Sequence, residues 1–250
     1  METLCFEPRV PIFDANVGVG HRPDQASPCD SPDELLAEMA HRGVERAVIY
    51  HLQAEFRSPV EGNEALNDWA TGKEAFSLQW SLGATDDSLR QLRQLHADGR
   101  VSSVRLHATI HARLPFVDWL YGPALEWLAA ERIPLWISLA DTEVTELMAI
   151  LPLYPQLVTV LLGAHYVHAA LVRPMLRRLP NAHLELSRYE VLGEVEALIR
   201  EFGIDRFLYG SFYPRYAMGP ILYYLHHLDC TDAELAGLCA GNLERLLNRQ

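Results

Sequence analysis

Several features that would assign this 250-residue chain to a class of protein are scarce in its sequence. It has only four cysteines, and no two of them form a C-x-x-C pair, which argues against a zinc knuckle or a disulfide framework and fits a reducing compartment. Its 21 Lys and Arg residues against 33 Asp and Glu residues give a net charge of -12. That balance leaves no basic surface for nucleic acid or for an anionic membrane.

Long apolar runs are also absent. No stretch approaches the roughly 20 apolar residues that span a bilayer, and the first residues include acids and prolines but no basic-then-apolar leader. We therefore expect a cytoplasmic protein that binds neither a membrane nor nucleic acid.

The common catalytic motifs are missing too. The chain has no H-x-H, H-E-x-x-H or D-x-D motif, no G-x-S-x-G, and no G-x-G-x-x-G after its first strand-like run. The nearest substitutes for a metal site are two histidine pairs, His107 with His111 and His165 with His168, and neither pair lies in a predicted regular helix. We therefore expect no metal and no cofactor.

Eight short runs rich in β-branched, aromatic and other apolar residues predict strands. They cover residues 10–17, 46–51, 76–82, 102–108, 134–140, 157–164, 182–188 and 206–211. Segments with helical periodicity lie between them, for example the one that Ser31 and Pro32 open and Gly43 ends. Alternating strands and helices with a period of roughly 31 residues predict an α/β fold, a (β/α)8 TIM barrel that forms one domain over residues 1–250. An open, doubly wound sheet is the alternative.

In such a barrel any site lies at the carboxyl ends of the strands, so the residues there are the candidates. We expect His107, His165 and Arg105 to be catalytic if the protein is an enzyme, because they can transfer protons or stabilise an anion. The candidates for binding a substrate are Asn16, Trp80, Ser138, Arg188, Tyr189, Ser211, Phe212 and Tyr213. Arg105, between two apolar residues, needs an anion if it is buried, either an internal partner such as Glu185 or a substrate carboxylate.

Several motifs along the chain are also recognisable as a set. They include "IFDANVGVG" near the start, "VRLHA", "YPQLVTVLLGAH", "LPNAHLELSR", "FLYGSFYP" and the closing "GNLERLL". From residue 10 to residue 247 the sequence resembles the amidohydrolase-related barrels, in particular the branch that includes the aminocarboxymuconate-semialdehyde decarboxylase-like enzymes. The resemblance implies a metal-dependent-hydrolase-like barrel.

The resemblance also implies that the metal ligands of that family have been replaced. Where the family has an Asp-x-His-x-His motif, residues 14–18 read Asp-Ala-Asn-Val-Gly. The histidines that usually end the fifth and sixth strands correspond to Ser138 and Gly163, although His165 lies two residues further on. The family's carboxylate in Gly-Ser-Asp-x-Pro corresponds to Phe212. We therefore predict that the metal centre is lost, because the charges that would hold a divalent ion are gone.

Three functions remain open. The barrel binds a small organic acid, a carboxylate or aromatic acid, without the family's metal-assisted chemistry. Alternatively, it is a metal-independent hydrolase or carbon–carbon lyase that uses the histidines and Arg105. In the third case it is an inactive structural or regulatory partner of an active relative, and residues 221–228 ("ILYYLHHL") offer an apolar interface. The sequence is also compatible with a homo-oligomer.

Overall fold

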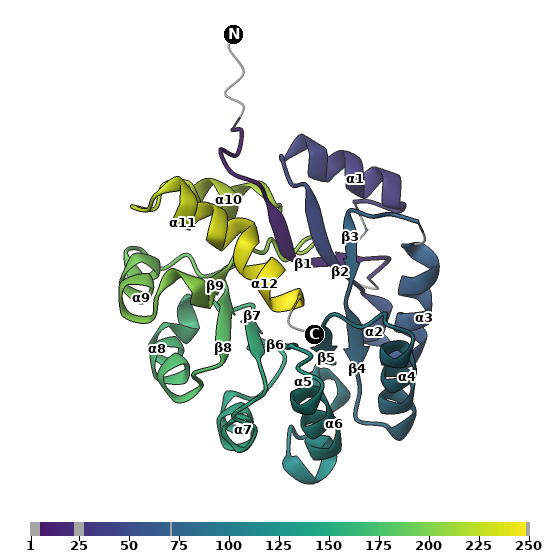
Figure 1. Ribbon diagram of the computed structural model, residues 1–250. Helices are drawn as coiled ribbons and strands as arrows, with labels where there is room; N and C mark the ends of the chain where they lie inside the picture. The colour runs from purple at the N-terminus through teal and green to yellow at the C-terminus, as the bar shows by residue number, and fades with distance from the viewer. Residues whose placement is uncertain (1–5, 23–27, 71, 249–250) are drawn as a thin grey trace.

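The computed structural model describes residues 6–22, 28–70 and 72–248, and its strands alternate with helices along the chain (Figure 1). The strands are β1 (Phe13–Val19), β2 (Arg46–His51), β3 (Phe76–Leu78), β4 (Trp80–Leu82), β5 (Val104–Leu106), β6 (Leu135–Ser138), β7 (Thr159–Leu162), β8 (Ala182–Glu185) and β9 (Phe207–Leu208). Each of the eight predicted runs overlaps a strand, the third run contains two, and β1 extends two residues beyond the first run. The prediction of the strands is therefore confirmed.

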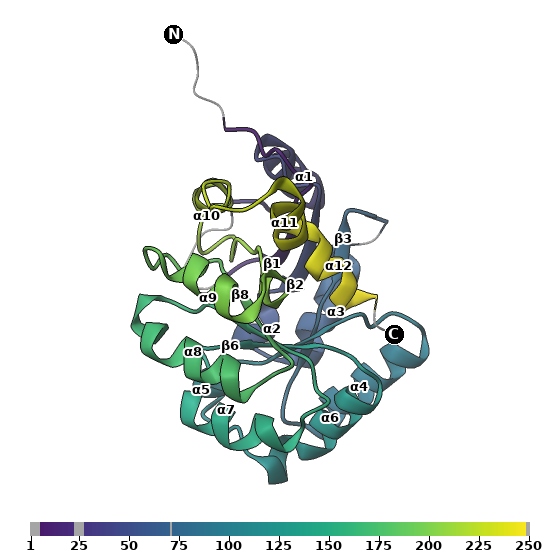
Figure 2. The same ribbon diagram turned by 60° about the vertical axis from the view of Figure 1, so that its left-hand side comes forward.

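The helices lie around the outside of the strands (Figure 1 and Figure 2). They are α1 (Pro32–His41), α2 (Gln53–Phe56), α3 (Pro59–Trp69), α4 (Asp86–Ala97), α5 (Thr109–Ala112), α6 (Asp118–Ala130), α7 (Val144–Ile150), α8 (Ala169–Arg178), α9 (Glu194–Phe202), α10 (Gly219–Leu225), α11 (Asp232–Ala236) and α12 (Asn242–Leu247). Short 3-10 turns are η1 (Leu151–Leu153), η2 (Tyr166–His168) and η3 (Ile204–Arg206), and η4 (Gly237–Gly241) is a π-helical turn. Within the described residues no helix is both long enough and apolar enough to cross a membrane.

The strands form two parallel sheets that together make a barrel. The first sheet has the order β1-β2-β3 and the second the order β4-β5-β6-β7-β8-β9. The sheets join through Gln79 between β3 and β4, whose backbone N–H donates to Ile49 at 2.9 Å. On the other side, Ala15 N–H donates to Tyr209 at 3.1 Å and Gly18 N–H to Tyr213 at 2.7 Å. These single bonds between β1 and the segment after β9 connect the two sheets, and we call them the seam.

The C-terminal helices support the last, two-residue strand. The sequence predicts one helix over residues 231–249, whereas the structure divides its described part into α11, η4 and α12. The π-helical turn leaves the carbonyl of Leu238 free to accept a hydrogen bond from Tyr209 N–H at 3.0 Å. The Asn242 side chain donates to the carbonyl of Phe207 at 2.8 Å. The irregular turn thus gives β9 the hydrogen bonds that a longer strand would find in the sheet.

Apolar side chains fill the barrel, and α12 covers one of its ends. Phe13 and Trp136 of the strands are buried in one cluster with Leu243 and Leu246 of α12, and α12 runs across the ring in Figure 1. Trp136 Nε1 donates to the carbonyl of Ala15 at 3.2 Å, so its only polar atom is satisfied inside the core. Because α12 blocks this end, the carboxyl ends of the strands are the remaining place for a site.

Two helix starts follow the sequence prediction and one does not. Thr231 forms the capping box that its spacing to Glu234 predicts at the start of α11, and Ser31, which was predicted to open its helix, forms a capping box at the start of α1. The segment "YGPALEWLAAERI" (121–133) predicts a helix with Pro123 near its start, but α6 begins at Asp118 and contains Pro123 in its interior. The longer helix includes Tyr121, which is buried with its ring 5.1 Å from that of Phe116.

The N-terminal segment covers the surface that residues 221–228 were expected to expose. The Phe6 ring lies 5.5 Å from Tyr223 and 5.0 Å from His226. Arg9 N–H donates to His226 Nε2 at 3.3 Å, and Arg9 Nη1 donates to the His226 carbonyl at 2.6 Å. Most apolar side chains of residues 221–228 are buried within the chain. The expectation of a large exposed interface at residues 221–228 was therefore wrong.

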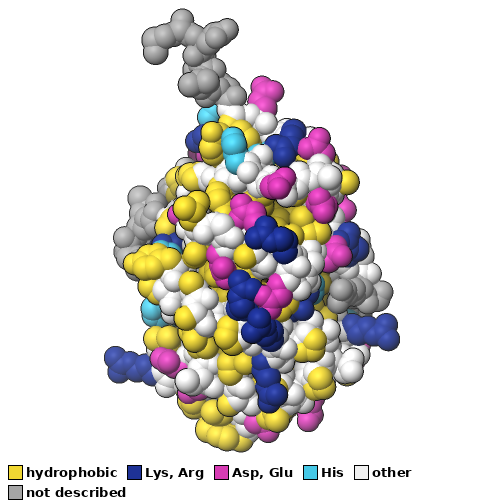
Figure 3. All heavy atoms as spheres, turned by 90° about the vertical axis from the view of Figure 1, so that its left-hand side faces the viewer, with side chains coloured by type: hydrophobic (Ala, Val, Ile, Leu, Met, Phe, Trp, Pro, Cys, Tyr) yellow, Lys and Arg dark blue, Asp and Glu magenta, His cyan; other side chains and the backbone are white. Residues whose placement is uncertain are grey.

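Ion pairs align α8 with α9 on the side of the molecule shown in Figure 3. Arg173 Nη2 donates to Glu194 at 2.7 Å, and Arg177 Nε donates to Glu201 at 2.8 Å. Figure 3 shows basic and acidic side chains next to one another on this face. Such exposed pairs contribute little individually, so they align the helices more than they stabilise the fold.

Candidate functional site

Arg105, in the middle of β5, is the centre of a polar group inside the barrel. Its side chain is 4% exposed, and its Nη1 donates to Asn16 Oδ1 at 3.1 Å. Its Nη2 lies 3.5 Å from Glu55 Oε1, and the guanidinium lies 3.8 Å from the centre of the Tyr50 ring. The expected internal anion is therefore present, but it is Glu55 and not Glu185. A buried guanidinium of this kind is stable only because an acid and an aromatic face meet it.

Glu55 lies on α2, and the sequence analysis did not single it out. It accepts from two guanidinium groups, since Arg215 Nη2 lies 3.3 Å from its Oε2. Arg215 follows β9, so α2 connects residues that are far apart in the sequence. The only sequence signal for Glu55 is a lone acid between Ala54 and Phe56 directly after the second strand, and such a pattern is common on exposed helices.

Two buried carboxylic acids lie beside this group. Glu185 accepts hydrogen bonds from the Ser187 backbone at 2.7 Å, from the Ser187 hydroxyl at 2.9 Å and from Asn16 Nδ2 at 3.3 Å. Asp14 accepts from the backbone N–H groups of Asn16 and Ser211, both at 2.9 Å. Burial raises the pKa of Glu185 to about 7 and that of Asp14 to about 6, although these hydrogen bonds lower both values. Asn16 thus links Arg105 to an acid that titrates near neutral pH.

The pKa of Glu185 predicts how stability depends on pH. Because the folded-state pKa lies above the ordinary value of 4.5, the contribution of Glu185 is greatest below pH 4.5 and is lost as the pH rises through about 7. Between pH 5 and pH 8 we expect this group to lower the free energy of unfolding by about 2 to 3 kcal/mol. Urea unfolding at pH 5 and at pH 8 measures this change. The free energy of unfolding should decrease less between the two pH values in Glu185→Gln than in the wild type. The exposed Glu74→Gln should keep the wild-type dependence, and equal dependence in all three proteins would contradict the assignment.

Phe212 closes the barrel above Arg105. Its ring lies 6.0 Å from the Arg105 guanidinium and 4.9 Å from that of Arg215, and the residue is 2% exposed. Its φ of 57° is unusual for a bulky residue, and it follows Ser211, whose N–H donates to Asp14. The Ser211 hydroxyl accepts from Tyr213 N–H at 3.0 Å and so helps to fix the turn. The backbone is held in a strained conformation that places an aromatic ring between two cations.

The two candidate histidines differ in their relation to this group. His107 Nε2 lies 3.2 Å from the Glu55 carbonyl, so His107 and Arg105 both contact Glu55 of α2. Burial lowers its pKa, and the ring is therefore neutral near pH 7. His165 is the N-cap residue directly before η2, and burial together with Arg188 lowers its pKa. Among the described residues the His165 ring lies 4.0 Å from that of Tyr166 and has no contact with Arg105, so of the two histidines the structure brings His107 into the group.

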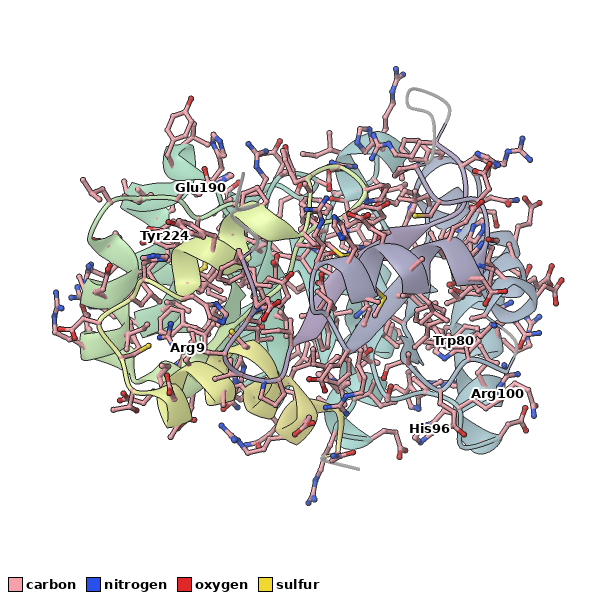
Figure 4. The ribbon with its side chains drawn as sticks, turned by 90° about the horizontal axis from the view of Figure 1, so that it is seen from above. Arg9, Trp80, His96, Arg100, Glu190 and Tyr224 are labelled. Atoms are coloured by element: carbon pink, nitrogen blue, oxygen red, sulfur yellow. The ribbon has the colours of Figure 1, made fainter. Side chains whose placement is uncertain are left out.

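Three of the expected substrate contacts lie elsewhere. Trp80 is the first residue of β4 and is 1% exposed; its Nε1 donates to the Arg100 carbonyl at 2.8 Å. Figure 4 shows Trp80 with Arg100 and His96 on the side of the molecule opposite Arg9. Tyr189 is fully buried in the apolar core, and the Tyr213 hydroxyl lies 3.0 Å from the Cys29 thiol. Because neighbouring residues of a strand face opposite sides, sequence position alone could not assign these side chains to the barrel interior.

Ser138 and Arg188 lie nearer the strand ends. The Ser138 hydroxyl donates to Asp141 Oδ2 at 2.6 Å, an arrangement that satisfies the serine within the chain. The Arg188 guanidinium lies 4.2 Å from the centre of the Tyr216 ring, and that ring lies 6.1 Å from Phe212. Arg188 is therefore connected to the Arg105 group through two aromatic rings.

These residues do not fit a divalent metal ion. Across the part of the chain that the structure describes, no three His, Cys, Asp or Glu side chains come close enough together to hold one. Asn16 Oδ1 accepts from Arg105, and the Phe212 ring lies 6.0 Å from the same guanidinium. A cation next to the Arg105 guanidinium would be repelled.

The fold and the position of this group define a class of protein: parallel α/β barrels with a site at the carboxyl ends of the strands. A family model described as amidohydrolase matches residues 14–249. The chain belongs to the amidohydrolase family.

Solved structures agree with this assignment at the level of the fold. An uncharacterised TIM-barrel protein of Bordetella bronchiseptica is 20% identical, with 95% of this chain and 98% of that chain covered and a TM-score of 0.77. The 5-carboxyvanillate decarboxylase of Sphingomonas paucimobilis is 15% identical, with 95% and 99% covered and a TM-score of 0.72. A dihydroxybenzoic acid decarboxylase of Polaromonas sp. JS666, solved with manganese and the inhibitor 2-nitroresorcinol, is 13% identical, with 96% and 98% covered and a TM-score of 0.77. No curated protein matches the chain. The barrel prediction is thus confirmed.

Proposed function

We propose that this protein binds a small organic acid at the carboxyl end of its barrel and that it does so with arginine side chains in place of the family's metal centre. The observation that carries the proposal is Arg215, whose Nε is buried and has no hydrogen-bond partner among the described residues. A buried N–H donor without a partner costs free energy, and a ligand oxygen would remove that cost.

The balance of charge supports an anionic ligand. Arg105 and Arg215 share the single carboxylate of Glu55, at 3.5 and 3.3 Å. Arg188 rests on the Tyr216 ring and forms no ion pair with a carboxylate of the described residues. The nearby acids have raised pKa values, about 6 for Asp14 and about 7 for Glu185, so near pH 7 Asp14 is mostly ionised and Glu185 is about half neutral. The group therefore has more positive than negative charge, and one carboxylate would balance it.

The aromatic side chains favour a ligand with a ring. Phe212 and Tyr216 lie 6.1 Å apart with guanidinium groups on both sides, from Arg215 and from Arg188. Tyr216 is 39% exposed and can stack with an aromatic acid from solvent. The names of the decarboxylases described above refer to aromatic acids, which is the same chemical class.

Replacing Arg215 by Met tests the proposal. Calorimetry with benzoate and with isophthalate should give saturable binding to the wild type, and Arg215→Met should weaken it by about tenfold or more, because a charge-assisted hydrogen bond is lost. Arg90→Met is the matched control, since Arg90 is exposed on α4 and pairs only with Asp87 among the described residues. Absence of binding to the wild type, or equal affinity in both variants, would contradict the proposal.

A metal-independent lyase is the second candidate, and Glu185 favours it. Its acid titrates near neutral pH and connects through Asn16 to Arg105, so the chain holds a proton next to an anion-binding group. Carbon dioxide release in the calorimetry samples would favour this function over binding alone.

A further inference from the structure

A cavity lies beside the ends of β1 and β2. Its volume is about 470 Å³, within the range of small-molecule sites. Its walls come from the residues after β1, from the end of β2, from α2 and from the last residue of α3. Its lining includes the basic and aromatic residues Arg22, His51, Phe56, Arg57 and Trp69.

This cavity is separate from the Arg105 group. Helix α2 has a single turn, in which Gln53 and Phe56 share one face because they are three residues apart. Both line the cavity, whereas Glu55 lies on a different face and contacts Arg105. Gly62 of α3 holds α2 in place, since a Cβ at this position would lie 2.4 Å from Ala54. One rigid turn therefore divides the two sites.

The side chains around the cavity suit a flat anion. The Arg22 guanidinium lies 5.0 Å from the centre of the Phe56 ring, so a cation and an aromatic face are already paired at the wall. Arg57 is exposed and forms no ion pair with a carboxylate of the described residues. Among the residues that the structure describes, Asp30 is the one acid of the wall, and it lies 3.8 Å from His21.

Two further N–H donors belong to residues of the cavity wall, Trp69 and His51. Trp69 Nε1 is buried and has no hydrogen-bond partner among the residues the structure describes. His51 Nδ1 accepts from Gln53 N–H at 3.2 Å, which places the ring proton of the neutral histidine on Nε2. Burial lowers the pKa of His51 and so maintains this neutral form. Nε2 lies against Gly20, where a Cβ would approach it to 2.4 Å.

We propose that this cavity is a second binding site, for a planar aromatic compound that carries an anionic group. The ring lies against Phe56 and Trp69, and Arg22 and Arg57 bind the anion.

Naphthalene-2-sulfonate is a suitable probe, with 2-naphthol as the uncharged analogue and inorganic sulfate as the anion without a ring. In calorimetry on the full chain, the sulfonate should bind at least about tenfold more tightly than either analogue, because only it uses both the ring and the charge. Arg22→Met and Arg57→Met should each weaken its binding by about tenfold, and Trp69→Phe should weaken it while keeping the stacking surface. Arg90→Met should bind as the wild type does, and melting temperatures would establish that each variant is folded.

The test of this cavity can be distinguished from the test of the proposed function. Arg215→Met should keep the sulfonate binding that Arg57→Met weakens, whether or not organic acids also bind near Arg105. Loss of binding in Arg215→Met with normal binding in Arg57→Met would overturn the proposal and place the probe at the Arg105 group. Equal binding of all three compounds, or no binding, would also overturn it.

Discussion

Glu55→Gln is expected to destabilise the protein by about 3 to 5 kcal/mol and, at the same time, to bind organic acids more tightly than the wild type. Glu55 is the carboxylate that lies within 3.5 Å of both Arg105 and Arg215. Removal of one member of a buried ion pair leaves the other charges without compensation, which costs about that much free energy. The side-chain NH2 group of Gln would also face the N–H donors of an arginine, with which it cannot form a hydrogen bond. A bound carboxylate would replace the lost charge.

The two effects are measured on the same samples. Chemical unfolding gives the free energy with and without isophthalate, and the acid should restore about 2.7 kcal/mol at a hundred times its Kd. Glu64→Gln, an exposed position on the neighbouring helix α3, should change neither quantity. A destabilised Glu55→Gln that binds acids no better than the wild type would mean that the arginines near Glu55 do not contact the ligand.

The second large effect is expected at Gly210. A Cβ there would lie 2.3 Å from Glu185 Oε1 and 2.8 Å from its Cγ and Cδ. Glu185 cannot move away without breaking its hydrogen bonds to Ser187 and Asn16. Gly210→Ala should therefore lower the free energy of unfolding by about 3 kcal/mol, the upper end of the cost of overpacking a core.

A double-mutant cycle identifies the cause. Glu185→Ala removes the atoms that the new Cβ would contact, so the double variant should be more stable than Gly210→Ala alone. Gly219→Ala serves as the control, since a Cβ at Gly219 meets no heavy atom within 4 Å and its backbone φ is ordinary. Additive effects of the two changes would show that Gly210 is required for a reason other than the space that Glu185 occupies.

The barrel could be predicted from the sequence because its signals are local. Short β-branched runs, capping residues such as Ser31 and Thr231, and a regular spacing are properties of neighbouring residues. The irregular parts depend on distant contacts. The π-helical turn forms where Leu238 can accept from Tyr209, and no pattern within residues 231–249 signals that contact.

The site was predicted only in part for the same reason. Arg105 was identified because a charged residue in an apolar strand requires a partner. The identity of that partner depends on where α2 folds over the barrel, so Glu55 and Arg215 could not be chosen over Glu185. The loss of the family's metal centre stays a prediction, as do the single domain and the cytoplasmic location.

The seam gives the barrel a preferred place to open. Along most of the ring neighbouring strands share a ladder of backbone bonds, whereas β1 is joined to the segment after β9 by the amides of Ala15 and Gly18. Amide protons exchange with solvent at a rate set by how often their local structure opens. The protons of these two residues should therefore exchange faster than those in the middle of β7, although all lie in the core. Because Phe212 and Arg215 follow directly along this edge, each opening would also admit water, and any dissolved acid, to the Arg105 guanidinium, whose side chain is otherwise only 4% exposed.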